Sequence, residues 1–153
     1  MRYNPVSIET NNYVERIIEE VSLISKKDQT IVHQHTGDNM VSLDEHLMKN
    51  VLINLLSNGI KYSPNGANVE LITHKQSNQL SIQVKDYGIG IPQEDQKHMF
   101  TRFFRATNVT AIQGTGLGLT IVKRYLDLMR GEITFESTLG EGSSFSLTIP
   151  QSV

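Results

Sequence analysis

The stretch LDEHLMKNVLINLLSNGIKYSPNG, residues 43–66, decides the fold of this protein. Its apolar residues recur at the spacing of a helix, which predicts a long helix from Leu43 to about Tyr62. Ser42 followed by Glu45 has the pattern of a capping box and predicts the start of this helix. The Ser-Pro-Asn-Gly segment after Tyr62 ends it. Because apolar side chains cover most of the helix, other elements must cover it in the folded protein.

A stripe of amides runs along this helix. Asn50, Asn54 and Asn58 are spaced one helical turn apart, and Lys61 follows three residues later. Asparagine is a poor helix former, so such a stripe needs hydrogen-bond partners. One interpretation is that the amides bond to neighbouring turns of the backbone. The other is that they line a polar cleft, where an amide oxygen can ligate magnesium and an ammonium group can meet phosphate.

Periodicity on either side of the long helix predicts the remaining elements. In chain order they are a helix at 12–26, short strands at 30–34 and 40–41, a hairpin of 68–74 and 79–85, a helical piece at 93–104, a helix at 115–129 and strands at 132–137 and 143–149. Because hairpins alternate with helices, we expect an α+β fold: a two-layer α/β sandwich in which helices cover one face of a mixed sheet.

Composition narrows the class of protein. The 153 residues suit one domain of ordinary size. A net charge of −2 provides no global positive field, so we expect no nucleic-acid partner. The absence of cysteine excludes disulfides, thiolate zinc sites and thiol nucleophiles. His33 and His35 share a strand face, but without a third nearby ligand we expect them to be solvated rather than to bind a metal.

Five of the eleven glycines crowd into residues 88–118. In Asp86-Tyr87-Gly88-Ile89-Gly90, an acid marks the end of a strand, and the glycines allow backbone to approach a ligand closely. The segment GTGLGL, residues 114–119, opens a helix, and the first N–H groups of a helix can bind phosphate. The first segment could also be an ordinary turn. The second has neither the dinucleotide nor the P-loop spacing, and it could also serve tight packing alone.

Five segments, in this order and spacing, resemble the catalytic, ATP-binding domain of bacterial sensor histidine kinases. They are NVLINLLSNGIKYSPNG (50–66), DYGIGIP (86–92), FTRFFR (100–105), GTGLGL (114–119) and GEGSSFSLTIP (140–150). The wider superfamily includes gyrase B, MutL and heat-shock chaperones. The resemblance covers nearly the whole chain, and it implies a Bergerat-type ATP-binding fold with ATP and Mg²⁺ as cofactors.

The resemblance also implies roles for individual residues. Asn58 would ligate magnesium, and Asp86 would accept a hydrogen bond from the adenine amino group, which guanine cannot offer. Phe100 and Phe103 would anchor a lid. Asn54, Lys61 and Arg105 would act in catalysis. The residues implied for ATP binding are Asn54, Asn58, Lys61, Tyr62, Asp86, Gly88, Gly90, Ile91, Phe103, Arg105, Gly114, Thr115, Gly116, Leu117, Gly118 and Leu119.

Position 54 bears on the reaction. Relatives that hydrolyse ATP have a glutamate one turn before the magnesium-binding asparagine, whereas Asn54 cannot take a proton at neutral pH. Phosphoryl transfer to an imidazole depends on positioning and charge neutralisation instead. We therefore expect transfer of the γ-phosphoryl group to a histidine on a separate domain, because none of the five histidines lies in the family's phosphoacceptor motif. Alternatives are an anti-sigma-factor-like serine kinase, a chaperone-like or DNA-repair ATPase, and a non-catalytic nucleotide-binding module.

The same resemblance implies a setting for the domain. We expect residues 1–11 to be a linker remnant from a missing dimerisation domain, 12–150 to be the ATP-binding domain and 151–153 a tail. The expected partners are that helical phosphoacceptor domain and a response regulator of a two-component system, while the isolated domain is expected to be a monomer. The expected location is the bacterial cytoplasm, as part of a membrane-anchored sensor kinase. One departure is Gly59, which stands where the family commonly has alanine.

Overall fold

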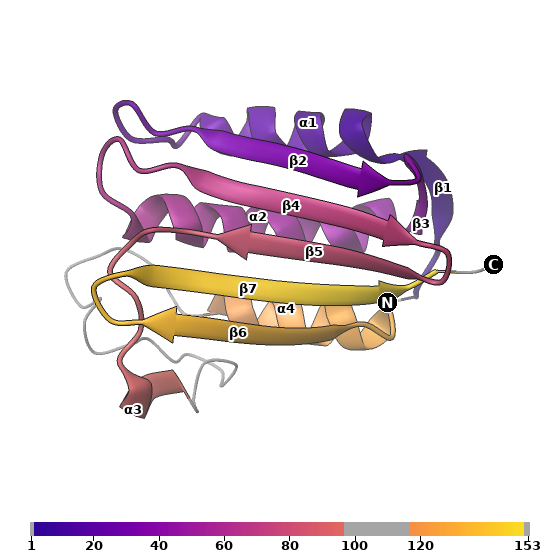
Figure 1. Ribbon diagram of the computed structural model, residues 1–153. Coiled ribbons are helices and arrows are strands. Elements are labelled where there is room, and N and C mark those ends of the chain that lie inside the picture. The colour runs from indigo at the N-terminus through magenta and orange to yellow at the C-terminus, as the bar shows by residue number, and fades with distance from the viewer. Residues whose placement is uncertain (1, 97–116, 152–153) are drawn as a thin grey trace.

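A computed structural model describes residues 2–96 and 117–151. Helices cover one face of a mixed sheet, which confirms the predicted two-layer sandwich (Figure 1). The elements are β1 (Val6–Glu9), α1 (Thr10–Ser22), β2 (Ile31–Gly37), β3 (Met40–Leu43), α2 (Glu45–Tyr62), β4 (Val69–Gln76), β5 (Gln79–Lys85), α3 (Gln93–Gln96), α4 (Leu117–Leu128), β6 (Glu132–Thr138) and β7 (Gly142–Pro150).

The main sheet has five strands in the order β2-β4-β5-β7-β6. The predicted hairpins β4–β5 and β6–β7 are antiparallel, and β5 also pairs antiparallel with β7. The expectation that strands pair as sequential hairpins is wrong for β2 and β3. β2 runs parallel to β4, and β3 pairs with β1 in a separate two-stranded sheet. A parallel pair needs a crossover, and the buried helix α2 supplies it.

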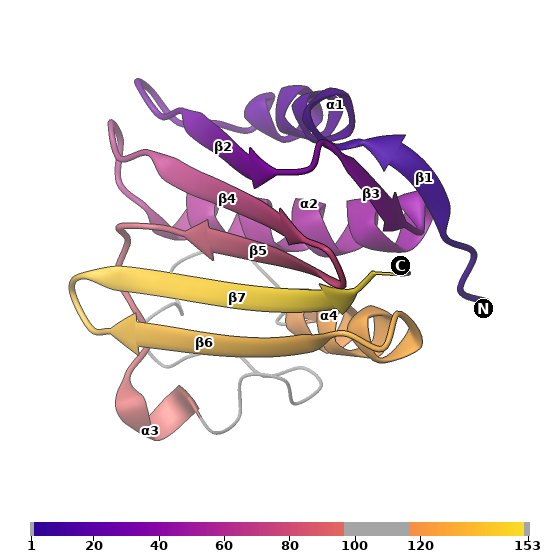
Figure 2. The same cartoon turned by 45° about the vertical axis from the view of Figure 1, so that its right-hand side comes forward.

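The core lies between the sheet and the helices. α2 runs between α1 and α4, as the turned view shows (Figure 2). Its inward residues are almost fully buried: Leu47, Met48, Val51, Leu52, Leu55, Leu56 and Ile60. They pack against apolar residues that alternate along β4, β5 and β7. The broad face that α2 buries against the sheet and the neighbouring helices explains why its sequence is so apolar.

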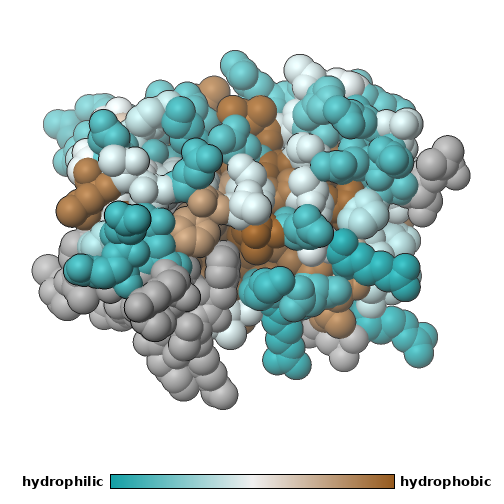
Figure 3. Space-filling view, turned by 60° about the horizontal axis from the view of Figure 1, so that its bottom comes forward, coloured by the Kyte–Doolittle hydropathy of each residue, from teal (hydrophilic) through white to brown (hydrophobic). Residues whose placement is uncertain are grey.

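Seen from the side of β6 and α4, hydrophilic residues cover most of the described surface, and apolar side chains show in a central band (Figure 3). None of the helices in residues 2–96 and 117–151 is long and apolar enough to cross a membrane. Most large apolar side chains of the described residues are buried between the sheet and the helices, although Leu23 and Leu139 are exposed.

The start of α2 differs from the prediction. The N-cap is Asp44, whose Oδ1 accepts the N–H of Leu47 at 3.0 Å. Ser42 is extended in β3, where the side chain of Gln151 bonds both its N–H and its carbonyl oxygen, at 2.7 and 2.9 Å. The capping box predicted at Ser42 is therefore wrong, because pairing with β1 and Gln151 holds that residue in a strand.

The N-terminal segment contains a strand that the sequence did not predict. Residues 6–9, which were predicted as part of a linker, form β1 against β3. α1 begins at Thr10 and ends at Ser22, four residues before the predicted end at 26. From there the chain turns back toward α2, since the Lys26 N–H donates to Gln29 Oε1 at 2.9 Å and Asp28 has a positive φ of 59°. This turn contacts the far end of α2.

Candidate functional site

The predicted site residues that the structure describes lie on α2, on the loop after β5 and at the start of α4. Asn54, Asn58 and Tyr62 are partly buried on α2, and Lys61 is exposed on its last turn. The helix therefore presents a polar edge opposite its buried face, as the periodicity predicts.

The amides of the stripe do not all behave alike. Asn50 Nδ2 donates to the carbonyl oxygen of His46, and Asn54 Nδ2 donates to that of Asn50, both at 2.8 Å. For these two residues the interpretation of bonds to neighbouring turns is correct. Asn58 makes no side-chain hydrogen bond with any residue that the structure describes. Its amide oxygen is thus available to a ligand, and amide oxygens suit magnesium.

Asp86 stands directly after β5, and the two oxygens of its carboxylate have different surroundings. Its Oδ1 accepts the N–H groups of Gly88 at 3.0 Å and Ser143 at 3.2 Å. Its Oδ2 has no partner within the described part of the chain. Burial raises the pKa of Asp86 to about 6, and the two backbone hydrogen bonds oppose that rise. The geometry fixes one oxygen and leaves the other as an acceptor.

The loop after Asp86 is pressed against the end of α2. The Ile89 N–H donates to the carbonyl oxygen of Tyr62 at 3.1 Å. A Cβ on Gly88 would overlap that same oxygen, so only glycine allows the contact. A Cβ on Gly142 would likewise overlap the backbone of Asp86. These glycines therefore allow backbone to pack on backbone around the carboxylate.

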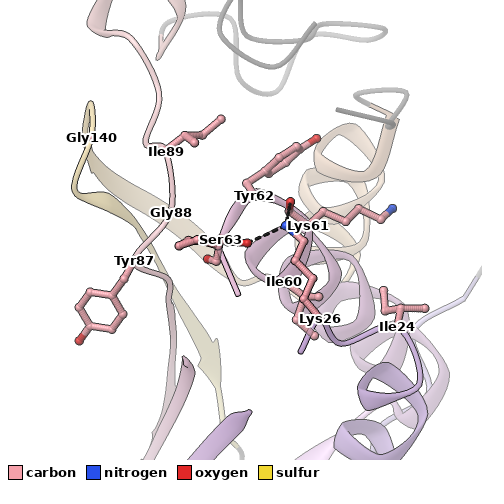
Figure 4. A pocket seen from close by; sticks show the side chains of 11 residues that line it. Ile24, Lys26, Ile60, Lys61, Tyr62, Ser63, Tyr87, Gly88, Ile89 and Gly140 are labelled. Atoms are coloured by element: carbon pink, nitrogen blue, oxygen red, sulfur yellow. Dashed lines mark hydrogen bonds between the residues drawn. The ribbon is translucent and has the colours of Figure 1, made fainter. Parts of the chain in front are cut away.

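A cleft of about 790 Å³ opens between this loop and the C-terminal end of α2 (Figure 4). Of the predicted residues, Lys61, Tyr62 and Gly88 line it, while Asn54, Asn58 and Asp86 do not. The Tyr87 ring points away from α2, and Ile89 points toward it. Among the residues that the structure describes, the lining consists of Ile24, Lys26, Ile60, Lys61, Tyr62, Ser63, Pro64, Tyr87, Gly88, Ile89 and Gly140.

Gly59 faces the strand side of the site. A Cβ at this position would lie 3.2 Å from both methyl groups of Val69 and 3.6 Å from the Cβ of Asp86. Compared with the alanine common in the family, Gly59 lacks one methyl group in the helix. In the structure it also brings α2 close to β4 and to Asp86.

Part of the predicted site cannot be placed. The helix predicted from 115 is confirmed from Leu117 onward, and Leu119 is buried in it. Gly90 and Ile91 lie in the loop after β5, where the Ile91 N–H donates to Ser137 Oγ at 2.8 Å. Outside the described residues lie Phe100, Phe103, Arg105, Gly114, Thr115 and Gly116.

His33 and His35, which were expected to be solvated, are hydrogen-bonded within the fold. Both rings bond the hydroxyl oxygen of Thr73, at 3.0 and 2.7 Å, and His35 Nε2 donates to the carbonyl oxygen of Asp38 at 2.9 Å. Burial and the neighbouring His35 lower the pKa of His33. Within residues 2–96 and 117–151 there is no cluster of three His, Cys, Asp or Glu residues that could hold a metal ion.

Sequence reasoning missed three contributors. It assigned no role to Ser143, whose N–H holds Asp86, although the segment GEGSSFSLTIP was singled out. Neither Lys26 nor Gln29 belongs to any motif of the sequence. The side chains of Lys26 and Gln29 bond the end of α2. No local pattern could have found these bonds, since more than thirty residues separate each pair of partners.

A partly buried acid after a strand, a helix whose Asn58 amide has no partner among the described residues, and a glycine loop packed between them point to one family of nucleotide-binding domains. Residues 43–153 match the family described as histidine kinase-, DNA gyrase B-, and HSP90-like ATPase. The chain belongs to this family. Within this family, the similar proteins identify the chain as a catalytic, ATP-binding domain of the sensor histidine kinase type.

Two curated relatives illustrate this. The sensor-like histidine kinase SenX3 of Mycolicibacterium smegmatis is 44% identical over 110 residues, which are 71% of this chain and 29% of SenX3. The sensor histidine kinase WalK of Bacillus subtilis is 34% identical over 147 residues, which are 88% of this chain and 24% of WalK. The matched part of the chain thus spans only 24% to 29% of the length of these two relatives.

Solved structures agree on the fold. The mycobacterial sensor histidine kinase MprB superposes with a TM-score of 0.83 at 23% identity, over 95% of this chain and 98% of that one. Full-length ShkA in complex with AMPPNP superposes with a TM-score of 0.85 at 20% identity, over 100% of this chain and 32% of that one. At these identities the likeness establishes the fold, which is the Bergerat fold expected from the sequence.

Proposed function

We propose that this domain binds Mg-ATP and transfers the γ-phosphoryl group to a histidine of another domain, as the catalytic part of a sensor histidine kinase. The observation that carries the proposal is the carboxylate of Asp86, which has one oxygen anchored by two N–H groups and the other open. The family match and the names of the relatives support the reading.

Asp86 would select the base. An ionised carboxylate only accepts hydrogen bonds, and adenine offers an amino group where guanine offers a carbonyl oxygen. Two acceptors facing each other are unfavourable, so ATP is preferred over GTP. Because Gly88 and Ser143 hold Oδ1, the open Oδ2 has a defined direction for this contact.

The polar edge of α2 would meet the phosphates. Asn58, whose amide has no partner among the described residues, would ligate Mg²⁺, and Lys61 on the next turn would contribute positive charge. Magnesium, when bound, neutralises charge on the phosphate oxygens. Tyr62, Gly88, Gly90, Ile91, Leu117, Gly118 and Leu119 would complete the described part of the site, together with Phe103, Arg105, Gly114, Thr115 and Gly116 from outside it.

The residue at position 54 favours transfer over hydrolysis. The amide of Asn54 cannot accept a proton at neutral pH, and its Nδ2 is already bonded to the carbonyl oxygen of Asn50. In the proposed step, a neutral imidazole nitrogen of the acceptor attacks the γ-phosphorus. The bond from that phosphorus to the bridging oxygen of ADP breaks, and ADP leaves with the electron pair.

A phosphotransfer assay tests the proposal. The chain is mixed with γ-labelled ATP, Mg²⁺ and the phosphoacceptor domain of a related sensor kinase, and the label is then analysed. We expect the label on the acceptor to be acid-labile and alkali-stable, as for phosphohistidine. Acid-stable label on serine would indicate the serine-kinase alternative. ATP binding without any transfer would indicate a nucleotide-binding module, and sustained phosphate release would indicate an ATPase.

The expected setting follows from the same proposal. The relatives are sensor kinases that are longer than this chain, so a dimerisation and phosphoacceptor domain is the partner, with a response regulator as the next acceptor. We place the domain in the cytoplasm, where ATP is available, as part of a membrane-anchored sensor.

A further inference from the structure

The C-terminal end of α2 has no local cap. The helix ends at Tyr62, and the following residue, Ser63, is extended with φ −102° and ψ 149°. The last carbonyl groups of a helix have no partner within the helix. Backbone N–H groups at and after a left-handed glycine, or polar side chains, commonly satisfy them. Here the partners must come from elsewhere in the fold.

Three distant groups supply those partners. Gln29 Nε2 donates to the carbonyl oxygen of Ile60 at 3.1 Å, and Lys26 Nζ donates to that of Lys61 at 2.7 Å. The Ile89 N–H donates to the carbonyl oxygen of Tyr62 at 3.1 Å. Lys26 Nζ also donates to the carbonyl oxygen of Ser63 at 2.6 Å, drawn as a dashed line in Figure 4. The last turn of α2 is therefore satisfied by tertiary contacts.

The turn that carries Lys26 and Gln29 is itself braced. The Lys26 N–H donates to Gln29 Oε1 at 2.9 Å, and the Gln29 N–H donates back to the carbonyl oxygen of Lys26 at 3.1 Å. Gln29 is 8% exposed, so its amide is committed to these contacts. The Gly66 N–H donates to the carbonyl oxygen of Lys27 at 3.0 Å, which ties the turn to the chain leaving α2. A braced turn can hold the helix end in one place.

We propose that Lys26 and Gln29 are positioning residues for the phosphate end of the nucleotide site. The inference rests on the proposed function, in which Lys61 and Tyr62 of this last turn contact the nucleotide. Without a cap the last turn of a helix frays. Lys26 and Gln29 hold its carbonyl groups, so the Lys61 side chain starts from a fixed backbone. The positive charge of Lys26 at the helix C-terminus also opposes the helix dipole.

A pair of lysine variants tests this on the intact chain. Lys26→Met removes the charge and the two carbonyl bonds but keeps the aliphatic stem. Lys27→Met removes the same charge one residue away, where the side chain is exposed and has no hydrogen bond or ion pair with the described residues. Lys26→Arg restores charge and donors. Binding of Mg-ATP and of adenosine is measured by titration calorimetry.

We expect Lys26→Met to weaken Mg-ATP binding about fivefold and adenosine binding less than about twofold, because the lost bonds hold the phosphate end. Lys26→Arg should recover most of the affinity, and Lys27→Met should bind like the parent. Equal binding by Lys26→Met and Lys27→Met would overturn the proposal. Equal losses for ATP and adenosine would also overturn it, since they indicate general loosening. A parent chain that does not bind ATP would refute the proposed function instead.

Gln29 has its own matched control. Gln151 is also buried and also donates its amide to a backbone carbonyl oxygen, that of Ser42 at 2.9 Å, at the opposite end of α2. Gln29→Ala and Gln151→Ala thus remove similar bonds. Unfolding by urea confirms that each variant folds and measures its loss of stability. We expect only Gln29→Ala to weaken Mg-ATP binding, and an equal effect of both variants contradicts a positioning role.

Discussion

The two ends of α2 are held in different ways. At the N-terminal end, Asp44 is the N-cap residue, and its Oδ1 accepts the N–H of Leu47, three residues later in the chain. Its Oδ2 accepts the Asn4 N–H at 2.8 Å. At the C-terminal end, groups from Lys26, Gln29 and Ile89 satisfy the carbonyl groups. The first end directly follows β3, which pairs with β1, while the second adjoins the cleft and the loop of Asp86. A local cap suffices where the helix serves the fold, and the end beside the candidate site depends on tertiary contacts.

The largest expected effect is a loss of Mg-ATP affinity on substitution of Asp86, beside the C-terminal end of α2. Asp86→Asn replaces the open acceptor with a group that also carries N–H donors, which would face the donor group of adenine. We expect Mg-ATP affinity to fall by about 100-fold, because a buried hydrogen-bond partner is lost or opposed. Titration calorimetry measures this at pH 7.5. Affinity within about threefold of the parent would contradict the assigned role of Asp86.

The same variant has a pH-dependent effect on stability. The pKa of Asp86 in the folded state, about 6, lies above its ordinary value of 3.8, so the folded protein favours the protonated acid. The stability from this group is fully present below pH 3.8 and is lost as the pH rises through about 6. The free energy of unfolding of Asp86→Asn should therefore gain about 2 to 3 kcal/mol on the parent between pH 4 and pH 7.5.

Urea unfolding at a series of pH values measures this difference. The control is Asp127→Asn, whose free energy of unfolding is measured over the same pH range. Asp127 is exposed on α4, where it pairs with Lys123 at 3.0 Å. A constant difference between the parent and Asp86→Asn from pH 4 to pH 7.5 would show that Asp86 is not destabilised by burial.

At the other end of the helix the effect should fall on stability alone. Asp44→Ala removes the N-cap and leaves the N–H groups of Asn4 and Leu47 without their acceptor. We expect a loss of about 2 kcal/mol in the free energy of unfolding. Mg-ATP affinity of the folded variant should stay within about twofold of the parent, since the phosphate end is held separately. A tenfold loss of affinity would erase the contrast between the two ends.

The smallest expected effect lies between the ends. Gly59→Ala gains about 1 kcal/mol of helix propensity but brings a methyl group 3.2 Å from the methyls of Val69. We expect the two terms to cancel to within about 1 kcal/mol in the free energy of unfolding. In a Val69→Ala background the crowding is gone, so Gly59→Ala should stabilise. Additive effects of the two substitutions would show that the contact with Val69 is unimportant.

Strong periodicity made most elements readable from the sequence. α2, the β4–β5 hairpin and the β6–β7 hairpin follow from runs whose apolar spacing suits one structure. β1 was not predicted, because Val6–Glu9 is a short segment that becomes a strand only by pairing with β3. The start of α2 was misplaced for a related reason, since Gln151, over a hundred residues away, holds Ser42 extended.

The candidate site shows the same division. Asp86, Asn58 and the glycine loop could be named from the sequence, because they stand in short motifs that carry the resemblance to the family. The different states of Asn54 and Asn58 could not be named, since both are asparagines on one helix face and only packing distinguishes them. The same holds for Ser143, which meets Asp86 through the pairing of β7 with β5.

By itself, the sequence determined the two-layer class, the buried helix at its centre and the residues that identify the family, because hydrophobic periodicity and short motifs are local properties. The tertiary structure alone decided that β2 lies parallel to β4, which oxygen of Asp86 is open, and that Lys26 and Gln29 hold the end of α2. Those features depend on groups distant in the chain, whose meeting is set by how the layers pack and not by any local preference.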